Sequence, residues 1–165
     1  MKKARIAVYP GTFDPVTYGH IDIIKRASRI FDKVIVAVAR NPGKEILFTA
    51  DERVRMLKDS IAGIKNVAVD SFEGLIVDYV KKRGANVVVR GLRMLSDFEY
   101  EFQMALTNRK LAEGVETIFM MTHESYSYIS SKLIKEAVGL GADLGCFVPK
   151  KAEAFLRKRL KEKKG

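Results

Sequence analysis

Five short runs rich in Val and Ile alternate with helical segments from one end of this chain to the other, and no other feature limits its fold as strongly. The runs comprise residues 5–9, 33–39, 66–70, 86–90 and 115–121. Strands that alternate with helices form a parallel sheet that is covered by helices on both faces. We therefore predict an α/β fold with a doubly wound, five-stranded parallel sheet in the order 3-2-1-4-5, followed by a C-terminal helix.

The segments between these runs carry local helix signals. Thr49 and Glu52 have the spacing of a capping box, in which a hydroxyl and a carboxylate pair with the first backbone N–H groups of a helix. Ser96 and Glu99 repeat this pattern and predict a long helix that ends near Gly114. The inward face of that helix is expected to consist of Phe98, Phe102, Ala105 and Leu106.

The composition is that of a globular protein. With 165 residues, of which 47% are hydrophobic and 30% charged, we predict one domain over residues 1–165. No apolar stretch approaches the ~20 residues that a membrane span needs, and the N-terminal residues do not resemble a signal peptide. The single cysteine, Cys146, excludes an internal disulfide and is expected to be buried. These features predict a cytoplasmic protein that does not bind membranes.

The formal net charge of +10 raises the question of a nucleic-acid partner. Residues 157–165 carry six basic side chains and one acidic side chain, so half of the excess lies at the C-terminal end. Such a basic end is usually a solvated face or a frayed terminus. The rest of the charge could serve a polyphosphate ligand equally well. Because no nucleic-acid recognition motif is present, we expect no nucleic-acid partner.

Polar side chains follow the predicted strands at positions that can converge. Thr12 and His20 follow the first strand, Lys44 follows the second, and Arg90 and Arg93 follow the fourth. The fifth strand leads to Ser125, Ser127, Ser130 and Ser131. In a Rossmann-like sheet of this order, strands 1 and 4 meet at the switch point, and ligands bind beyond their carboxyl ends. Three cations, a histidine and hydroxyls beside a helix N-terminus suit a polyphosphate.

Residues 9–20 form the connection between the first strand and the first helix. Gly11 and Gly19 allow a ligand to approach the backbone closely. Thr12 and His20 are the side chains best placed to touch that ligand.

Each of these side chains also has a purely structural interpretation. His20 alone fits a helix cap or a core histidine, and Lys44 alone fits a solvated loop lysine. Arg90 could form a structural ion pair instead of binding phosphate. Its candidate partners are Asp97, Glu99 and Glu101.

Four segments together resemble the phosphopantetheine adenylyltransferases, which belong to the nucleotidyltransferase superfamily with a Thr/His-x-Gly-His motif. The matching segments are residues 9–22, Phe48 and Thr49 with Glu52 and Arg53, residues 89–93 with 97–101, and residues 128–136. The first segment marks the superfamily only. Arg-Gly-Leu-Arg at residues 90–93, followed by Asp-Phe-Glu-Tyr-Glu at 97–101, is much more specific to this family.

The resemblance implies that ATP and 4′-phosphopantetheine react to give dephospho-coenzyme A and pyrophosphate, with Mg²⁺ accompanying the triphosphate. It implies that Thr12 and His20 contact the α-phosphate, and that Thr12 also contacts the acceptor. Lys44 and Arg90 would hold the acceptor phosphate, and the backbone near Ile76 would line the pantetheine arm. The implied ATP-binding residues are Thr12, Phe13, His20, Gly91, Leu92, Arg93, Glu101, Tyr126, Ser127, Tyr128, Ile129, Ser130, Ser131 and Lys132. A homohexamer and feedback inhibition by coenzyme A are implied as well.

One position departs from the family pattern. Lys132 stands where the family usually has a third hydroxyl, so it could bind the β- or γ-phosphate or simply face solvent. The main alternative function is a sister transferase that uses another acceptor or CTP, such as a nicotinamide mononucleotide adenylyltransferase or a glycerol-phosphate cytidylyltransferase. The Arg-Gly-Leu-Arg segment argues against these sister enzymes.

Overall fold

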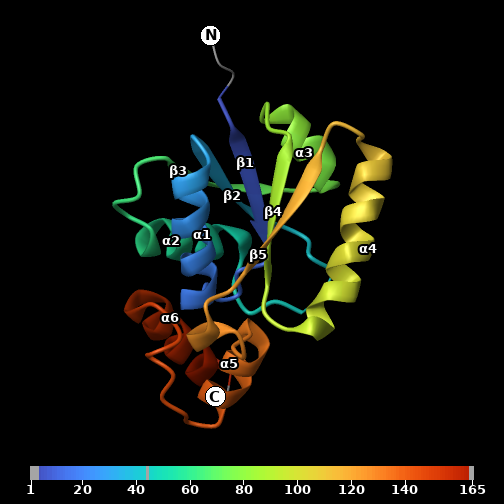
Figure 1. Cartoon of the computed structure of the whole chain (residues 1–165). Coiled ribbons are helices and arrows are strands. Elements are labelled where there is room, and N and C mark those ends of the chain that lie inside the picture. Colours follow the sequence, from blue (N-terminus) through green and yellow to red (C-terminus); the bar gives the residue numbers. More distant parts are fainter. Residues whose placement is uncertain (1–3, 44, 164–165) are drawn as a thin grey trace.

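The computed structural model describes residues 4–43 and 45–163 and contains a five-stranded parallel sheet (Figure 1). Its strands are β1 (Ile6–Gly11), β2 (Lys33–Ala39), β3 (Val67–Phe72), β4 (Val87–Leu92) and β5 (Glu116–Met121). They lie in the order β3-β2-β1-β4-β5, so the predicted strand order is confirmed.

Helices precede or follow every strand of this sheet. They are α1 (Tyr18–Ile30), α2 (Ala50–Ser60), α3 (Ile76–Lys82), α4 (Leu95–Leu111), the short 3-10 helix η1 (Glu124–Tyr126), α5 (Ser131–Gly139) and α6 (Lys150–Glu162). Figure 1 shows α5 and α6 together near the end of the sheet where the strands finish. The predicted C-terminal helix is therefore present, and with α5 it lies near the carboxyl edge of the sheet.

The two faces of the sheet bury separate hydrophobic clusters. Val34, Val36 and Val38 of β2 lie in one cluster, whereas Ile35 and Ala37 lie in the other. This alternation follows from the two-residue period of a strand. The first cluster contains residues of α1, α2, α5 and α6, and the second contains residues of α3. Helices thus cover both faces, as the sequence predicts.

The central strands β1 and β4 are paired over only part of their length. β1 pairs with β2 from Ile6 to Gly11, but it pairs with β4 only at Ala7–Val87 and Val8–Val88. Beyond these pairs, the carboxyl ends of β1 and β4 do not continue the ladder. The ladder between the central strands is therefore interrupted near the switch point, beyond which ligands bind in sheets of this kind.

The face of α4 that turns toward the sheet is not the predicted one. α4 begins after Met94 without a side-chain cap, and Phe98 and Phe102 are 41% and 46% exposed instead of facing inward. The inward side of the helix carries Glu101 and Asn108, which are both buried. Glu101 is bonded to Arg90 of β4. We attribute this difference to the ion pair, which turns Glu101 toward the sheet and leaves Phe98 stacked on Phe102 and edge-on against Phe119 of β5.

Cys146 is exposed, so its expected burial is also wrong. It lies in the connection between α5 and α6, where Val148 fills the core in its place.

The basic C-terminal end is helical, not frayed, as far as the structure describes it. α6 extends to Glu162, and Arg159 donates hydrogen bonds to the Leu47 carbonyl and to Glu52. Part of the positive charge of this segment therefore fastens α6 to the start of α2. Within residues 4–43 and 45–163, no helix has the length and apolar character needed to cross a membrane.

We expect Thr49→Ala to lower the free energy of unfolding by about 1 kcal/mol, the usual cost of a lost N-cap. Thr49 Oγ1 accepts a hydrogen bond of 3.3 Å from the backbone N–H of Glu52, and the Glu52 carboxylate accepts one of 2.8 Å from the backbone N–H of Thr49. Urea denaturation at one fixed protein concentration measures the change.

Ser96→Ala is the matched control, because Ser96 has the same sequence pattern but is exposed and does not cap α4. Its effect is expected to stay within about 0.5 kcal/mol. Equal losses in the two variants would contradict this account of the helix starts.

Candidate active site

His20 is both a helix-capping residue and a side chain of the proposed crevice, the region beyond the carboxyl ends of β1 and β4 that residues 9–20, 90–93 and 126–132 surround. Thr17 caps α1, and its Oγ1 accepts a hydrogen bond from the backbone N–H of His20 (3.3 Å). In return, Nδ1 of His20 accepts one from the backbone N–H of Thr17 (3.0 Å). Because a backbone N–H can only donate, a neutral imidazole in this position carries its proton on Nε2. The cap therefore orients His20 as a hydrogen-bond donor.

Phe13 holds the turn between β1 and α1 in an unusual conformation. Its φ angle is +53°, in the left-handed region that few residues other than glycine adopt. The ring is buried and lies edge-on against Tyr9 and His20, with centroid distances of 5.4 and 4.9 Å. A Cβ atom on Gly11 would lie 2.8 Å from this ring, so Gly11 leaves the space that Phe13 occupies. The packing of Phe13 thus helps to fix the position of His20.

Arg53 of α2 fastens the same turn; it lies in one of the matching segments, but no role was predicted for it. Its side chain is fully buried, and Nη1 donates hydrogen bonds of 2.8 Å to the carbonyls of Thr12 and Ala39. Nε donates a third bond, of 3.0 Å, to the carbonyl of Phe48. Burial lowers the pKa of the guanidinium, which is far too basic to lose its charge at neutral pH. A buried cation thus fixes the backbone of Thr12.

Asp14 is a second buried charge that the sequence did not single out. It is 3% exposed, and its two carboxylate oxygens accept hydrogen bonds from the backbone N–H groups of Leu47 (2.8 Å) and Phe48 (2.9 Å). Lys135 of α5 forms an ion pair with the same carboxylate at 2.8 Å. Asp14 therefore joins the turn after β1 to two other segments.

The other wall of the crevice is built around Arg90. Nε and Nη2 of Arg90 donate to the two carboxylate oxygens of Glu101, and Nη1 donates to the carbonyl of Pro10 at 2.8 Å. Burial alone would lower the pKa of Arg90, but the bonds to Glu101 raise it. The structural ion pair therefore exists, and its partner is Glu101. The bond to Pro10 also bridges the gap between β1 and β4.

Arg93, Gly91 and Leu92 continue this wall. Arg93 pairs with Asp97 (3.2 Å), and its Nη1 donates to the carbonyl of Ile129 at 3.0 Å. A Cβ atom on Gly91 would lie 3.4 Å from Ile23, so the backbone here is closely packed. The carbonyl of Leu92 accepts a bond of 2.9 Å from the N–H of Thr122, which ties this wall to the loop after β5.

The loop after β5 completes the crevice. Ser130 caps α5, because its side chain accepts a hydrogen bond of 3.1 Å from the backbone N–H of Leu133. Ser131 Oγ donates to the carbonyl of Pro15 at 2.8 Å, so this loop contacts the turn after β1. Tyr128 and Lys132 are exposed.

Three of the predicted segments are thus connected by hydrogen bonds. Arg90 links residues 90–93 to β1, Arg93 links them to the loop of residues 126–132, and Ser131 links that loop to the turn after β1. Tyr126 also lies near Tyr18 at the start of α1, with ring centroids 6.1 Å apart. The predicted convergence on one crevice is supported for these segments.

The predicted acceptor-binding position at Ile76 is less well connected. Ile76 is the first residue of α3 and packs against the second hydrophobic cluster. It follows β3, so it lies at the carboxyl edge of the sheet but two strands away from β1. Lys44 lies outside the described residues.

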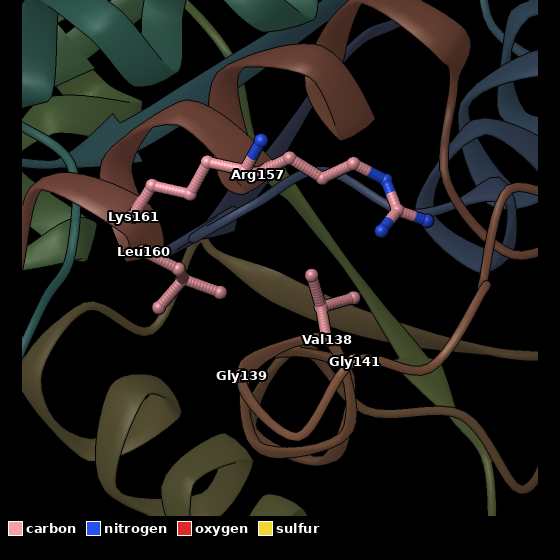
Figure 2. Close-up of a pocket in the computed structure, with 6 residues that line it drawn as sticks. All are labelled: Val138, Gly139, Gly141, Arg157, Leu160 and Lys161. Atoms are coloured by element: carbon pink, nitrogen blue, oxygen red, sulfur yellow. The ribbon is translucent and has the colours of Figure 1, made fainter. Parts of the chain in front are cut away.

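A separate hollow of about 260 Å³ lies between α5 and α6, with side chains from both helices at its rim (Figure 2). Its polar side chains are Arg157 and Lys161. Arg157 is held by Glu153 at 2.7 Å and by Asp143 at 3.4 Å. This hollow therefore lacks the convergent polar groups of the crevice at the switch point.

No protein-built metal site is visible in the described part of the chain, because no three His, Cys, Asp or Glu side chains gather closely enough to hold an ion. A metal ion at the crevice would need ligands from a bound molecule such as a triphosphate.

Comparison with known proteins identifies relatives over most of the chain. The model of the cytidylyltransferase-like family matches residues 8–137. The phosphopantetheine adenylyltransferase of Caldanaerobacter subterraneus is 59% identical over 145 residues, which are 88% of this chain and 91% of that protein. The enzyme of the same name from Carboxydothermus hydrogenoformans is 53% identical over 158 residues, 96% of this chain and 98% of that protein.

Solved structures show the same fold at lower identity. A protein from Vibrio parahaemolyticus described as a nicotinate-nucleotide adenylyltransferase matches with a TM-score of 0.69 and 18% identity. The match covers 93% of this chain and 99% of that protein. At this identity, the likeness supports the fold alone.

We expect Glu101→Gln to lower the free energy of unfolding by about 1–3 kcal/mol, because Arg90 would lose its charged partner in a largely buried place. Urea denaturation measures the loss. Glu99→Gln is the matched control, since Glu99 is two residues away on α4 but exposed, and its effect is expected within about 0.5 kcal/mol. A Glu101→Gln variant as stable as the control would show that the ion pair does not hold α4 in place.

Proposed function

The chain belongs to the cytidylyltransferase-like family and, within it, to the phosphopantetheine adenylyltransferases, and from this membership we propose its reaction. It transfers the adenylyl group of ATP to 4′-phosphopantetheine and releases pyrophosphate, a step of coenzyme A biosynthesis. The observation that carries the proposal is the 59% identity to an enzyme of this name over 88% of the chain. The crevice, with its cations and its oriented histidine, supports it.

The reaction is a single in-line displacement. An oxygen of the acceptor phosphate forms a bond to the α-phosphorus of ATP, the bond from that phosphorus to the bridging oxygen of the β-phosphate breaks, and pyrophosphate leaves with the electron pair. The acceptor phosphate is already an anion at neutral pH, so no protein base is needed. The protein therefore contributes positioning and charge stabilisation.

His20 and Thr12 act on the phosphate that reacts. The bond from Thr17 to Nδ1 leaves the proton of His20 on Nε2, which suits a donor to an α-phosphate oxygen. Arg53 fixes the Thr12 carbonyl, and a fixed backbone at this position suits the proposed contact of the Thr12 hydroxyl with the acceptor. Charge that builds on the α-phosphate is then met by a donor that is already oriented.

Lys44 and Arg90 hold the acceptor phosphate, and the backbone near Ile76 lines the pantetheine arm. Of the five N–H groups of Arg90, three have partners within the described residues, so two remain for phosphate oxygens. ATP is held by the residues around these groups. They are Phe13, Gly91, Leu92, Arg93, Glu101, Tyr126, Ser127, Tyr128, Ile129, Ser130, Ser131 and Lys132.

Mg²⁺ enters with ATP and is held mainly by its phosphate oxygens. A bound Mg²⁺ would neutralise charge on the pyrophosphate as it leaves.

The enzyme is a cytoplasmic homohexamer that coenzyme A inhibits by occupying the same crevice. Exposed apolar side chains support assembly, because Leu95 of α4 is 90% exposed and Met121 of β5 is 76% exposed. Coenzyme A combines the pantetheine arm and the adenosine for which this crevice is proposed, so it would compete with both substrates. Sedimentation velocity would show a species of six times 18.6 kDa, and a monomer alone would contradict the assembly.

We expect pyrophosphate release with ATP and 4′-phosphopantetheine, and at least about 100-fold less with nicotinamide mononucleotide or glycerol phosphate as acceptor. A site built for the polar groups of one substrate rejects another that leaves those groups unpaired. Coupled pyrophosphate detection with each acceptor, and with CTP in place of ATP, measures the preference. Release with nicotinamide mononucleotide but not with 4′-phosphopantetheine would overturn the proposed function in favour of a sister transferase.

His20→Ala is expected to slow turnover by about 10²–10³-fold, the usual cost of one lost transition-state donor. Because the His20 ring also accepts a hydrogen bond from the backbone N–H of Thr17, the variant is expected to lose some stability. Wild type and variant must therefore both be assayed well below their unfolding temperatures. Calorimetric ATP affinity is the control and is expected to change by less than about threefold, because the donor acts chiefly in the transition state. Near-normal turnover would remove His20 from the mechanism.

A further inference from the structure

Asp14 connects three segments through one buried carboxylate. It lies in the turn after β1, its oxygens accept the backbone N–H groups of Leu47 and Phe48, and Lys135 of α5 donates to it at 2.8 Å. Asp14 is 3% exposed, and the side chain of Lys135 is 24% exposed. A carboxylate in such a place needs partners, and here they come from two other parts of the chain.

The three segments carry, or adjoin, the residues that are proposed to bind the two substrates. The turn after β1 contains Thr12 and leads to His20, and the segment before α2 follows Lys44 in the sequence. The loop of residues 126–132, which is proposed to bind ATP and is called the ATP loop below, leads into α5. A shift of one segment against another would move the acceptor, the α-phosphate or the triphosphate away from the others. Misplacement by about 1 Å can cost a factor of about 100 in rate.

The turn after β1 is attached more strongly to the segment before α2 than to α5. The segment before α2 is fastened by Asp14 and also by Arg53, which bonds the carbonyls of Thr12 and Phe48. α5 is attached to the turn by the ion pair of Lys135 and by one bond from Ser131 to Pro15. Loss of Lys135 therefore loosens the ATP side and leaves the acceptor side fastened.

We propose that Lys135 and Asp14 are a positioning pair, in which the lysine places the ATP loop against Thr12 and His20. Neither residue touches the reacting atoms. The inference rests on the proposed function and adds residues that set the relative position of the two substrates. If the ion pair only stabilised the fold, its loss would lower the melting temperature without changing the affinity for one substrate in particular.

The test is Lys135→Met in the full chain, which keeps the apolar stem and removes the charge. The KM for ATP is expected to rise by about five- to thirtyfold, while the KM for 4′-phosphopantetheine changes by less than about twofold. Lys135→Arg is expected to recover most of the ATP affinity, because it restores a cation beside Asp14. Calorimetry of ATP binding without acceptor measures the affinity directly, and the same loss in Lys135→Met and recovery in Lys135→Arg are expected there.

Lys151→Met is the matched control, because Lys151 forms an exposed ion pair with Asp59 on the surface at 3.7 Å. It is expected to leave both KM values unchanged. Where Asp14→Asn folds, adding Lys135→Met to it is expected to change the KM for ATP by less than about twofold, since the two residues act as one pair.

The outcomes separate this inference from the proposed function. If wild type turns over 4′-phosphopantetheine but Lys135→Met has unchanged ATP affinity, or loses affinity for both substrates equally, the positioning pair is wrong. If wild type binds ATP but does not turn over 4′-phosphopantetheine, the proposed function is wrong. Weaker ATP binding in Lys135→Met would then still support the pair.

Discussion

The incomplete pairing of β1 with β4 is the constraint on which the candidate site depends. The two strands share a ladder only at Ala7–Val87 and Val8–Val88, so their carboxyl ends are free to hold different partners. Arg90 fills the gap between them by donating to the Pro10 carbonyl and to Glu101. Had the pairing continued, the backbone groups of this region would be bonded to each other, and Arg90 could not bond the Pro10 carbonyl in the same way.

Buried charges bonded to backbone groups hold the walls of this crevice. Arg53 binds three carbonyls, and Asp14 binds two backbone N–H groups and Lys135. Such groups are costly to bury, but they fix the backbone of these loops directly. The loops are therefore ordered before a ligand arrives, which is what catalysis by positioning and charge stabilisation requires.

The alternation of strands and helices was enough to predict the sheet order, because right-handed crossovers leave few arrangements for such a pattern. Local patterns were less reliable. Thr49 and Ser96 have the same capping sequence, but only Thr49 caps a helix, since Asp97 beside Ser96 is bonded to Arg93. Here a contact with a neighbouring side chain overrode the local signal.

Side chains whose partners are backbone groups were the hardest to find. His20 and Arg90 were identifiable because they follow predicted strands, whereas Asp14 and Arg53 act on carbonyl and N–H groups that any residue possesses. The exposed phenyl rings of α4 were missed for a related reason. Their direction follows from the pairing of Glu101 with Arg90, and the sequence left three acidic partners open.

The stereochemical course of the reaction tests most directly whether both substrates meet in this crevice and react without a protein nucleophile. An ATP analogue with a chiral thiophosphate at the α-position would be turned over with 4′-phosphopantetheine, and the configuration of the product would be determined by phosphorus NMR. One in-line displacement predicts inversion at the α-phosphorus. Retention would show two successive displacements through a covalent intermediate on a side chain and would contradict direct transfer.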